Sequence, residues 1–131
     1  MSAVTTTSAA TTCSTIQSSA ASNAPVTSRA VVEALKRFAT GTYALWYPLL
    51  SKIEARKLPD KLKNLGAANW LHVTLEVSTP PKDGFGMNGS GMFIINPPWT
   101  LEKTLHETLP ALTAILAQGD GARYTLESQS A

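Results

Sequence analysis

The chain has 131 residues, of which 44% are hydrophobic, and its formal net charge is +2. This length and composition are those of one globular domain with a modest core. The charge is too weak to indicate nucleic-acid binding by itself. A single cysteine, Cys13, excludes an internal disulfide and a cysteine zinc cluster. No apolar run approaches the roughly 20 residues of a membrane span, so we expect a cytoplasmic protein without membrane contact.

Residues 1–28 differ in composition from the rest of the chain. They are almost entirely Ser, Thr and Ala, and none of them is charged. They lack the basic start and apolar core of a secretory signal. Their side chains are too small to bury much apolar area, so we predict a disordered leader over residues 1–28 and a folded domain over residues 29–131. A flexible linker is an alternative role for the leader.

Beyond the leader, the pattern predicts a helix, a strand and further helices. The segment "RAVVEALKRFA" has apolar residues at helical spacing, and Gly41 ends this helix. Residues 42–47 are aromatic and β-rich, which predicts a buried strand. The polar segment 49–66 predicts two short helices separated at Pro59.

Two strands follow. Residues 70–78 alternate apolar and polar side chains, which predicts a half-exposed strand with His72 and Glu76 on its exposed side. A loop rich in Gly and Pro separates this strand from the apolar segment 91–96, a predicted central strand. Because no helix intervenes, we expect the two strands to pair antiparallel.

The last part of the chain predicts a helix and a short strand. Thr100 is the candidate helix cap, and we expect Pro110 to kink the helix. The segment "ARYTLES" predicts the final strand. The apolar face of the helix consists of Leu101, Leu105, Leu109, Leu112, Ile115 and Leu116.

This order of elements predicts an α/β protein that corresponds to half of an open sheet ending in an antiparallel hairpin. Such a half-sheet would leave one apolar edge bare. A bare edge offers unpaired backbone groups to other chains, so we expect self-association through it.

The segment "FIINPPW" ends in Asn96, Pro97, Pro98 and Trp99. Enzymes that methylate the amino group of adenine or cytosine carry a tetrapeptide of this form at a strand end. In it, oxygen acceptors bind the exocyclic amine and the aromatic ring stacks on the flipped-out base. The alternative is structural: the prolines end a strand, Trp99 packs in the core and Thr100 caps a helix. Four residues alone do not decide between these interpretations.

A methyl donor would also need a binding site. In open α/β folds, a glycine-rich turn after a strand and an acidic residue at the end of the next strand hold such a cofactor. The chain has no G-x-G-x-x-G after a predicted strand. The glycines of "GFGMNGSG" precede a strand, which favours a hairpin loop.

The remaining candidates are single residues and basic clusters. His72 and His106 have no neighbours at metal-ligand spacing, so we predict that both are surface residues. Lys36 and Arg37 stand just before a strand and are candidates for phosphate binding. A second basic cluster, on a predicted helix face, comprises Lys52, Arg56, Lys57, Lys61 and Lys63.

Two longer segments carry a resemblance to a known family. They are "KRFATGTYALWYP" at residues 36–48 and "GMNGSGMFIINPPWTLE" at residues 86–102. They resemble the bacterial ribosomal RNA large subunit methyltransferase J family over about residues 31–118. This resemblance implies S-adenosylmethionine as cofactor, methylation of adenine N6 in 23S rRNA, and the C-terminal half of a Rossmann-like class I methyltransferase sheet. Some members have been labelled as involved in catabolism of external DNA.

The resemblance also bears on the tetrapeptide. In that family the catalytic Asp-Pro-Pro-Tyr and the cofactor-binding residues lie upstream of the segment that matches residues 36–48. The element that matches residues 96–99 lies outside the active site. The resemblance therefore implies no catalytic and no cofactor-binding residue here, and a chain that does not bind S-adenosylmethionine alone.

Three functional hypotheses remain, in this order: an inactive C-terminal part of the methyltransferase, a non-catalytic RNA- or DNA-binding module, and a minimal enzyme that uses Asn96. The leader has no counterpart in the family, and we interpret it as translation in a shifted reading frame.

Overall fold

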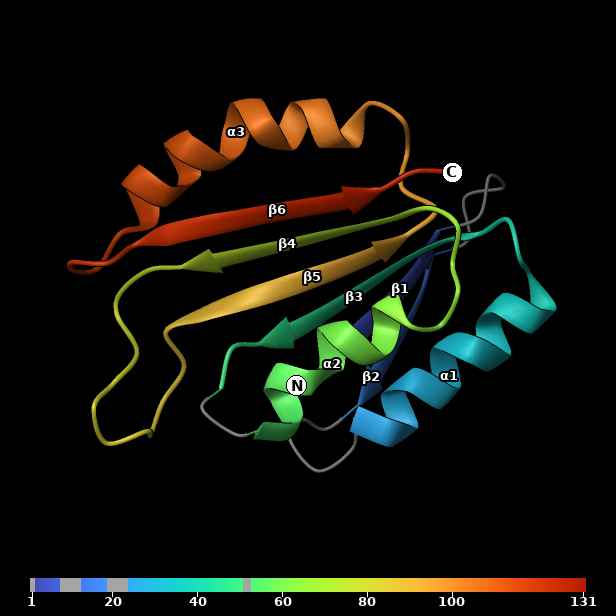
Figure 1. Ribbon diagram of the computed structural model, residues 1–131, viewed down its shortest axis with the longest axis horizontal. Coiled ribbons are helices and arrows are strands. Elements are labelled where there is room, and N and C mark those ends of the chain that lie inside the picture. The colour runs from blue at the N-terminus through green and yellow to red at the C-terminus, as the bar shows by residue number, and fades with distance from the viewer. Residues whose placement is uncertain (1, 8–12, 19–23, 51–52) are drawn as a thin grey trace.

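The computed structural model describes residues 2–7, 13–18, 24–50 and 53–131 (Figure 1). Its centre is a six-stranded sheet in the order β2-β1-β3-β5-β4-β6, and all neighbouring strands are antiparallel. The strands are β1 (Ser2–Thr7), β2 (Cys13–Ser18), β3 (Thr42–Pro48), β4 (Trp70–Glu76), β5 (Gly89–Ile95) and β6 (Arg123–Gln129). The helices are α1 (Ala24–Arg37), α2 (Ile53–Lys63) and α3 (Leu101–Leu116). The α/β class is confirmed, with an antiparallel sheet.

Strand β5 lies between β3 and β4. Its Phe93 stands opposite Leu45 of β3 and His72 of β4, and its side chain is almost fully buried. The antiparallel pairing of β4 with β5 and the central position of β5 confirm the sequence predictions. The predicted final strand is also present, as β6, and it pairs with the outer edge of β4.

The described part of the leader differs from the predicted disorder. Strands β1 and β2 form a hairpin, and β1 pairs with β3 along the edge that we expected to be bare. Small side chains bury little apolar area, but β-branched residues such as Val4 and Ile16 favour a strand. The open edge of β3 also offers backbone hydrogen bonds to an added strand. Helix α1 likewise begins upstream of the boundary at residue 29. Because β1 occupies the edge of β3, that edge has no unpaired strand through which the expected self-association could occur.

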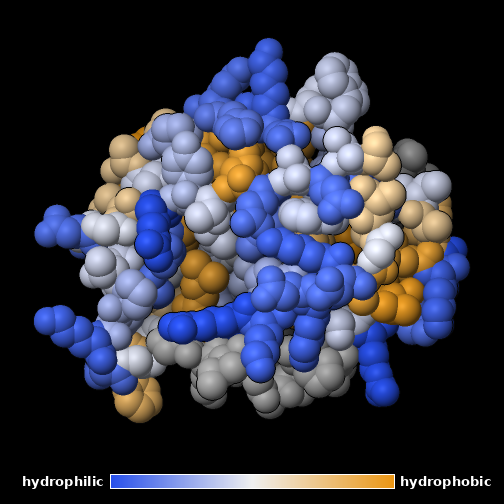
Figure 2. All heavy atoms as spheres, viewed as in Figure 1, coloured by the Kyte–Doolittle hydropathy of each residue, from blue (hydrophilic) through white to orange (hydrophobic). Residues whose placement is uncertain are grey.

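The core lies between one face of the sheet and helices α1 and α2. Every second residue of β3 and β5 points to it, because side chains alternate along a strand. The core cluster comprises Val31, Tyr43, Leu45, Tyr47, Leu58, Leu62, Trp70, Phe93 and Ile95. On the face that Figure 2 shows, hydrophilic residues cover much of the surface and hydrophobic residues are visible between them.

Helix α2 is continuous, so the predicted break at Pro59 is wrong. Pro59 lies inside the helix, between Leu58 and Leu62, which are both buried against the sheet. A proline in a helix interior costs one backbone hydrogen bond. The packing of the two leucines favours the helix more than the proline opposes it, since tertiary contacts supply most helical stability.

Helix α3 lies on the opposite face of the sheet and contacts β6 and β4 (Figure 1). Leu109 is the residue of this helix that is buried, whereas Leu112, Ile115 and Leu116 are exposed. The predicted apolar face is therefore only partly covered. Thr100 precedes the helix with helical backbone angles and makes no side-chain cap, so its predicted role is wrong. The predicted kink at Pro110 stays a prediction.

Candidate functional site

The two ends of the sheet differ because of strand direction. Strands β3 and β4 both run antiparallel to β5, so they run parallel to each other. Their last residues, Pro48 and Glu76, lie with the start of β5 at what we call the carboxyl end. Their first residues lie with the last residue of β5, Ile95, at what we call the amino end. In open α/β sheets, ligands bind outside the carboxyl ends of parallel strands.

The tetrapeptide of residues 96–99 follows β5 and therefore lies at the amino end. The Asn96 side-chain amide donates two hydrogen bonds of 2.9 Å, to the backbone carbonyls of Ala39 and Gly41. The Asn96 carbonyl accepts a 2.8 Å bond from the Thr42 hydroxyl. Its backbone φ of 51° lies in the left-handed region, which asparagine tolerates better than most residues. Asn96 thus joins the end of β5 to the turn between α1 and β3.

The aromatic residue of the tetrapeptide points to solvent. Trp99 is 93% exposed, so the structural interpretation was wrong in expecting this ring in the core. Trp99 lines one side of a groove of about 350 Å³, together with Pro97, Pro98 and Glu102. The Pro98 carbonyl accepts a 3.0 Å hydrogen bond from the Leu101 N–H, which begins α3. The tetrapeptide is thus a turn between a strand and a helix.

The carboxyl end holds a polar groove of about 270 Å³. Its lining residues come from the ends of β3, β4 and β6, from α2 and from the loop between β4 and β5: Leu49, Leu50, Arg56, Thr74, Glu76, Pro80, Asn88 and Arg123. The groove thus combines two guanidinium groups, a carboxylate, an amide and a hydroxyl. Such a surface suits a polar ligand.

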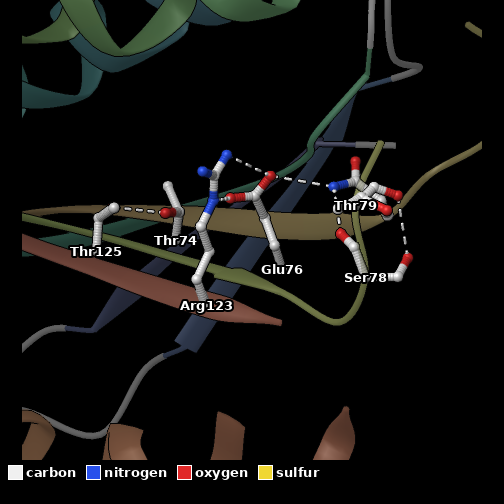
Figure 3. A network of polar contacts seen from close by, with 7 residues as sticks. Thr74, Glu76, Ser78, Thr79, Arg123 and Thr125 are labelled. Atoms are coloured by element: carbon white, nitrogen blue, oxygen red, sulfur yellow. Dashed lines mark hydrogen bonds and ion pairs between the residues drawn. The ribbon is translucent and has the colours of Figure 1, made fainter. Parts of the chain in front are cut away.

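Glu76 is the centre of a hydrogen-bond network in this groove (Figure 3). The Arg123 guanidinium binds both carboxylate oxygens, one of them at 3.3 Å. The Asn88 amide donates a 3.0 Å bond to Glu76 and a 3.1 Å bond to the Ser78 carbonyl. Glu76 is only 9% exposed, contrary to the prediction of an exposed side chain. The bonds from Arg123 lower the pKa of Glu76 against the opposing effect of burial. The Glu76 carboxylate is therefore charged, and both of its oxygens accept hydrogen bonds.

The loop between β4 and β5 borders the same groove. Pro80 and Asn88, near its two ends, line the groove. Between them, Phe85 is 81% exposed and stands between Gly84 and Gly86, whose φ angles are 72° and 104°. Positive φ is natural for glycine and costly for other residues. The two glycines therefore permit a turn that displays an aromatic ring to solvent.

His72 was predicted at the surface, and this prediction was wrong. Its ring is buried, and its Nε2 lies 2.6 Å from the Tyr47 hydroxyl. Nδ1 lies 3.7 Å from the Glu127 carboxylate, which is too far for a hydrogen bond. Burial, assisted by the charge of Lys63, lowers the pKa of His72. Helices were predicted upstream of this strand, but the alternation of residues 70–78 did not show that α2 packs over the His72 side of the strand. His106 is exposed, as predicted.

The two residues proposed for phosphate binding do not line the groove at the carboxyl end. Lys36 and Arg37 are exposed in the last turn of α1, and Lys36 pairs with Glu33 at 3.1 Å. Of the second basic cluster, Lys63 binds Glu127 and stands over the Trp70 ring, whereas Arg56 lines the groove. Lys52 lies outside the described residues. Of the cations in these two sets that the structure describes, Arg56 alone lines the groove.

A family model described as ribosomal RNA large subunit methyltransferase D, RlmJ, matches residues 21–127. The chain belongs to this family. It is 42% identical over 99 residues to ribosomal RNA large subunit methyltransferase J of Haemophilus influenzae and 43% identical over 96 residues to the protein of that name from Escherichia coli. The family match includes all of α1, so it begins earlier than the resemblance at residue 31.

The chain spans about a third of the length of these RlmJ relatives. The alignments cover 76% and 73% of this chain, but 35% and 34% of the relatives. The crystal structure of protein LPL1258 from Legionella pneumophila is also similar, with a TM-score of 0.71 and 28% identity. That match covers 82% of this chain and 39% of the other.

The RlmJ family implies S-adenosylmethionine, but the described residues do not fit this cofactor. Neither β3 nor β4 is followed by a glycine-rich turn into a helix, since β4 leads into a hairpin loop. Glu76 is acidic and ends a strand, yet its oxygens are occupied by Arg123 and Asn88. In the part of the chain that the structure describes, no cluster of His, Cys, Asp and Glu is placed to hold a metal, and no helix is long and apolar enough to cross a membrane.

Proposed function

We propose that this chain is the C-terminal part of a methyltransferase that transfers a methyl group from S-adenosylmethionine to adenine N6 of 23S rRNA in the cytoplasm. We further propose that the chain alone neither binds this cofactor nor transfers a methyl group. The family match over residues 21–127 and the alignments to about a third of the relatives' length support the first proposal. The position of Asn96, at the amino end of the sheet and bonded to two backbone carbonyls, carries the second.

The role of Asn96 follows from what the reaction requires. A catalytic asparagine must present its side-chain oxygen to an exocyclic amine beside the methyl donor. The Asn96 amide group is instead oriented by its bonds to Ala39 and Gly41, inside the turn between α1 and β3. The opposite end of β3 and β4 is the one where open α/β sheets bind ligands. We therefore assign Asn96, Pro97, Pro98 and Trp99 a structural role.

The strand order supports the C-terminal half of a Rossmann-like sheet. Strands β3 and β4 are parallel, and β5 returns between them as the second strand of an antiparallel hairpin. This is the hairpin expected at the end of such a sheet. In the relatives, the longer chain upstream would supply the preceding strands and the cofactor site.

A hybrid protein tests this proposal. It joins the N-terminal part of the Haemophilus influenzae relative to residues 24–131 of this chain, so that α1 stays whole. We expect the hybrid to transfer labelled methyl groups from S-adenosylmethionine to 23S rRNA. The chain alone should give no transfer and no saturable cofactor binding by calorimetry. Cofactor binding by the chain alone, or a folded hybrid without activity, would contradict the proposal.

A second candidate is an RNA-binding module without chemistry. The exposed cations Lys36, Arg37, Arg56 and Lys57 on α1 and α2 favour it. Phosphate contacts make binding strongly dependent on salt. If the chain alone binds RNA with a steep salt dependence and the folded hybrid is inactive, this candidate replaces the first.

A further inference from the structure

The carboxyl end carries two features that the proposed function does not use. One is the exposed Phe85 at the tip of the loop between β4 and β5. The other is Arg56, which lines the groove and has no ion-pair partner among the described residues. The loop and the groove are contiguous, because Pro80 and Asn88 belong to both.

We propose that the groove and this loop bind a single-stranded segment of RNA that flanks the target base, with Phe85 stacked on a base and Arg56 bound to a phosphate. This inference rests on the proposed function, because it assigns a substrate-binding subsite to the same enzyme. It concerns residues at the carboxyl end, where the missing part of the sheet would bring the target base.

The loop suits base stacking for three reasons. Phe85 and Met87 are 81% and 55% exposed, so apolar area is available that the fold does not bury. Gly84 and Gly86 permit the left-handed backbone on either side of Phe85, so the turn can present the ring without steric strain. Stacking on an aromatic ring tolerates any base, so it suits a segment that flanks the methylated position.

The groove suits the sugar-phosphate backbone. Arg56 supplies a charged fork, and the Thr74 and Asn88 side chains line the same surface. Two acidic groups lie nearby, Glu76 and Asp83. Glu76 is neutralised by Arg123, and Asp83 in the loop stands next to Lys82 and accepts a bond from the Phe85 N–H at 3.4 Å. The local balance therefore does not repel a phosphate.

The test measures binding of a fluorescent single-stranded RNA of about 12 nucleotides to the full chain and to the hybrid. We expect Phe85→Ala to weaken binding about tenfold, and Phe85→Tyr to retain it, since a tyrosine ring still stacks. Arg56→Gln should weaken binding and reduce the salt dependence by roughly one phosphate contact. Trp99→Ala is the matched control: it removes an exposed ring at the amino end and should leave binding unchanged.

Two results would overturn the inference. One is equal binding by Phe85→Ala and the unmodified chain. The other is an equal loss in Trp99→Ala, because that would indicate unspecific aromatic contact. If the hybrid methylates 23S rRNA and Phe85→Ala lowers neither binding nor kcat/KM, the proposed function stands and this inference alone fails.

Discussion

Each end of the sheet carries polar side chains and one exposed aromatic ring, but the surroundings of these residues differ. At the amino end, Asn96 is bonded to the turn before β3, and the exposed Trp99 lines a groove. At the carboxyl end, a polar groove adjoins a loop that displays Phe85. A tetrapeptide motif can be recognised in the local sequence, but its functional role depends on the end of the sheet to which its strand runs. Because β5 runs against β3 and β4, the catalytic-looking motif lies at the end opposite to the one where open α/β sheets bind ligands.

The largest expected effect is at Asn96. Asn96→Ala removes two hydrogen bonds and places alanine in the left-handed region, so we expect the free energy of unfolding to fall by about 2 kcal/mol. Urea denaturation measures this. Asn64→Ala, in an exposed turn, is the control and should change the unfolding free energy little. If Asn96→Ala unfolds with the same free energy as the unmodified chain, Asn96 does not have the structural role that we assign to the amino end.

At the carboxyl end, Glu76→Gln should cost about 1 kcal/mol at pH 7, because Arg123 is largely exposed and solvent weakens the pair. Hydrogen bonds from Arg123 lower the pKa of Glu76 in the folded state from 4.5. The pair therefore stabilises the protein above pH 4.5, and this stabilisation is lost as pH falls through the folded-state pKa. Denaturation between pH 7 and 3 should show a shallower decline for Glu76→Gln. Glu107→Gln, an exposed change, should keep the unmodified profile.

An effect confined to low pH is expected at His72 on the core face. Its pKa is lowered from 6.5 in the folded state, mainly by burial, so the unfolded chain binds the proton more readily. Stability should therefore decrease as pH falls below about 6.5, by at most about 1.4 kcal/mol per pH unit. His72→Gln should flatten the dependence between pH 7 and 5, whereas His106→Gln should not. Equal slopes in all three proteins would contradict the buried state of His72.

The sequence predicted the elements whose signals are local. The alternation of residues 70–78, the apolar segment 91–96 and the final strand were all found, because pattern and burial agree there. Features that depend on distant partners were missed. His72 is buried because α2 covers its strand, and Pro59 stays helical because Leu58 and Leu62 pack on the sheet.

The site was predicted less well than the fold. The family resemblance correctly indicated a methyltransferase relationship. The groove around Glu76 was not foreseen, since it gathers residues from four elements far apart in the chain. The signal available in the sequence was Phe85 between two glycines, but a glycine-rich loop is as consistent with a plain hairpin connection. The loop became a candidate binding element when the structure placed its two ends in the same groove as Arg56.

The most direct test of the contrast between the two ends is the turnover of the hybrid enzyme with Asn96→Ala, measured well below its unfolding temperature. We expect kcat for methylation of 23S rRNA to stay within about twofold of the unmodified hybrid, while the melting temperature falls by several degrees. A loss of kcat of about a hundredfold or more, with unchanged melting, would instead make Asn96 a catalytic residue and contradict the account.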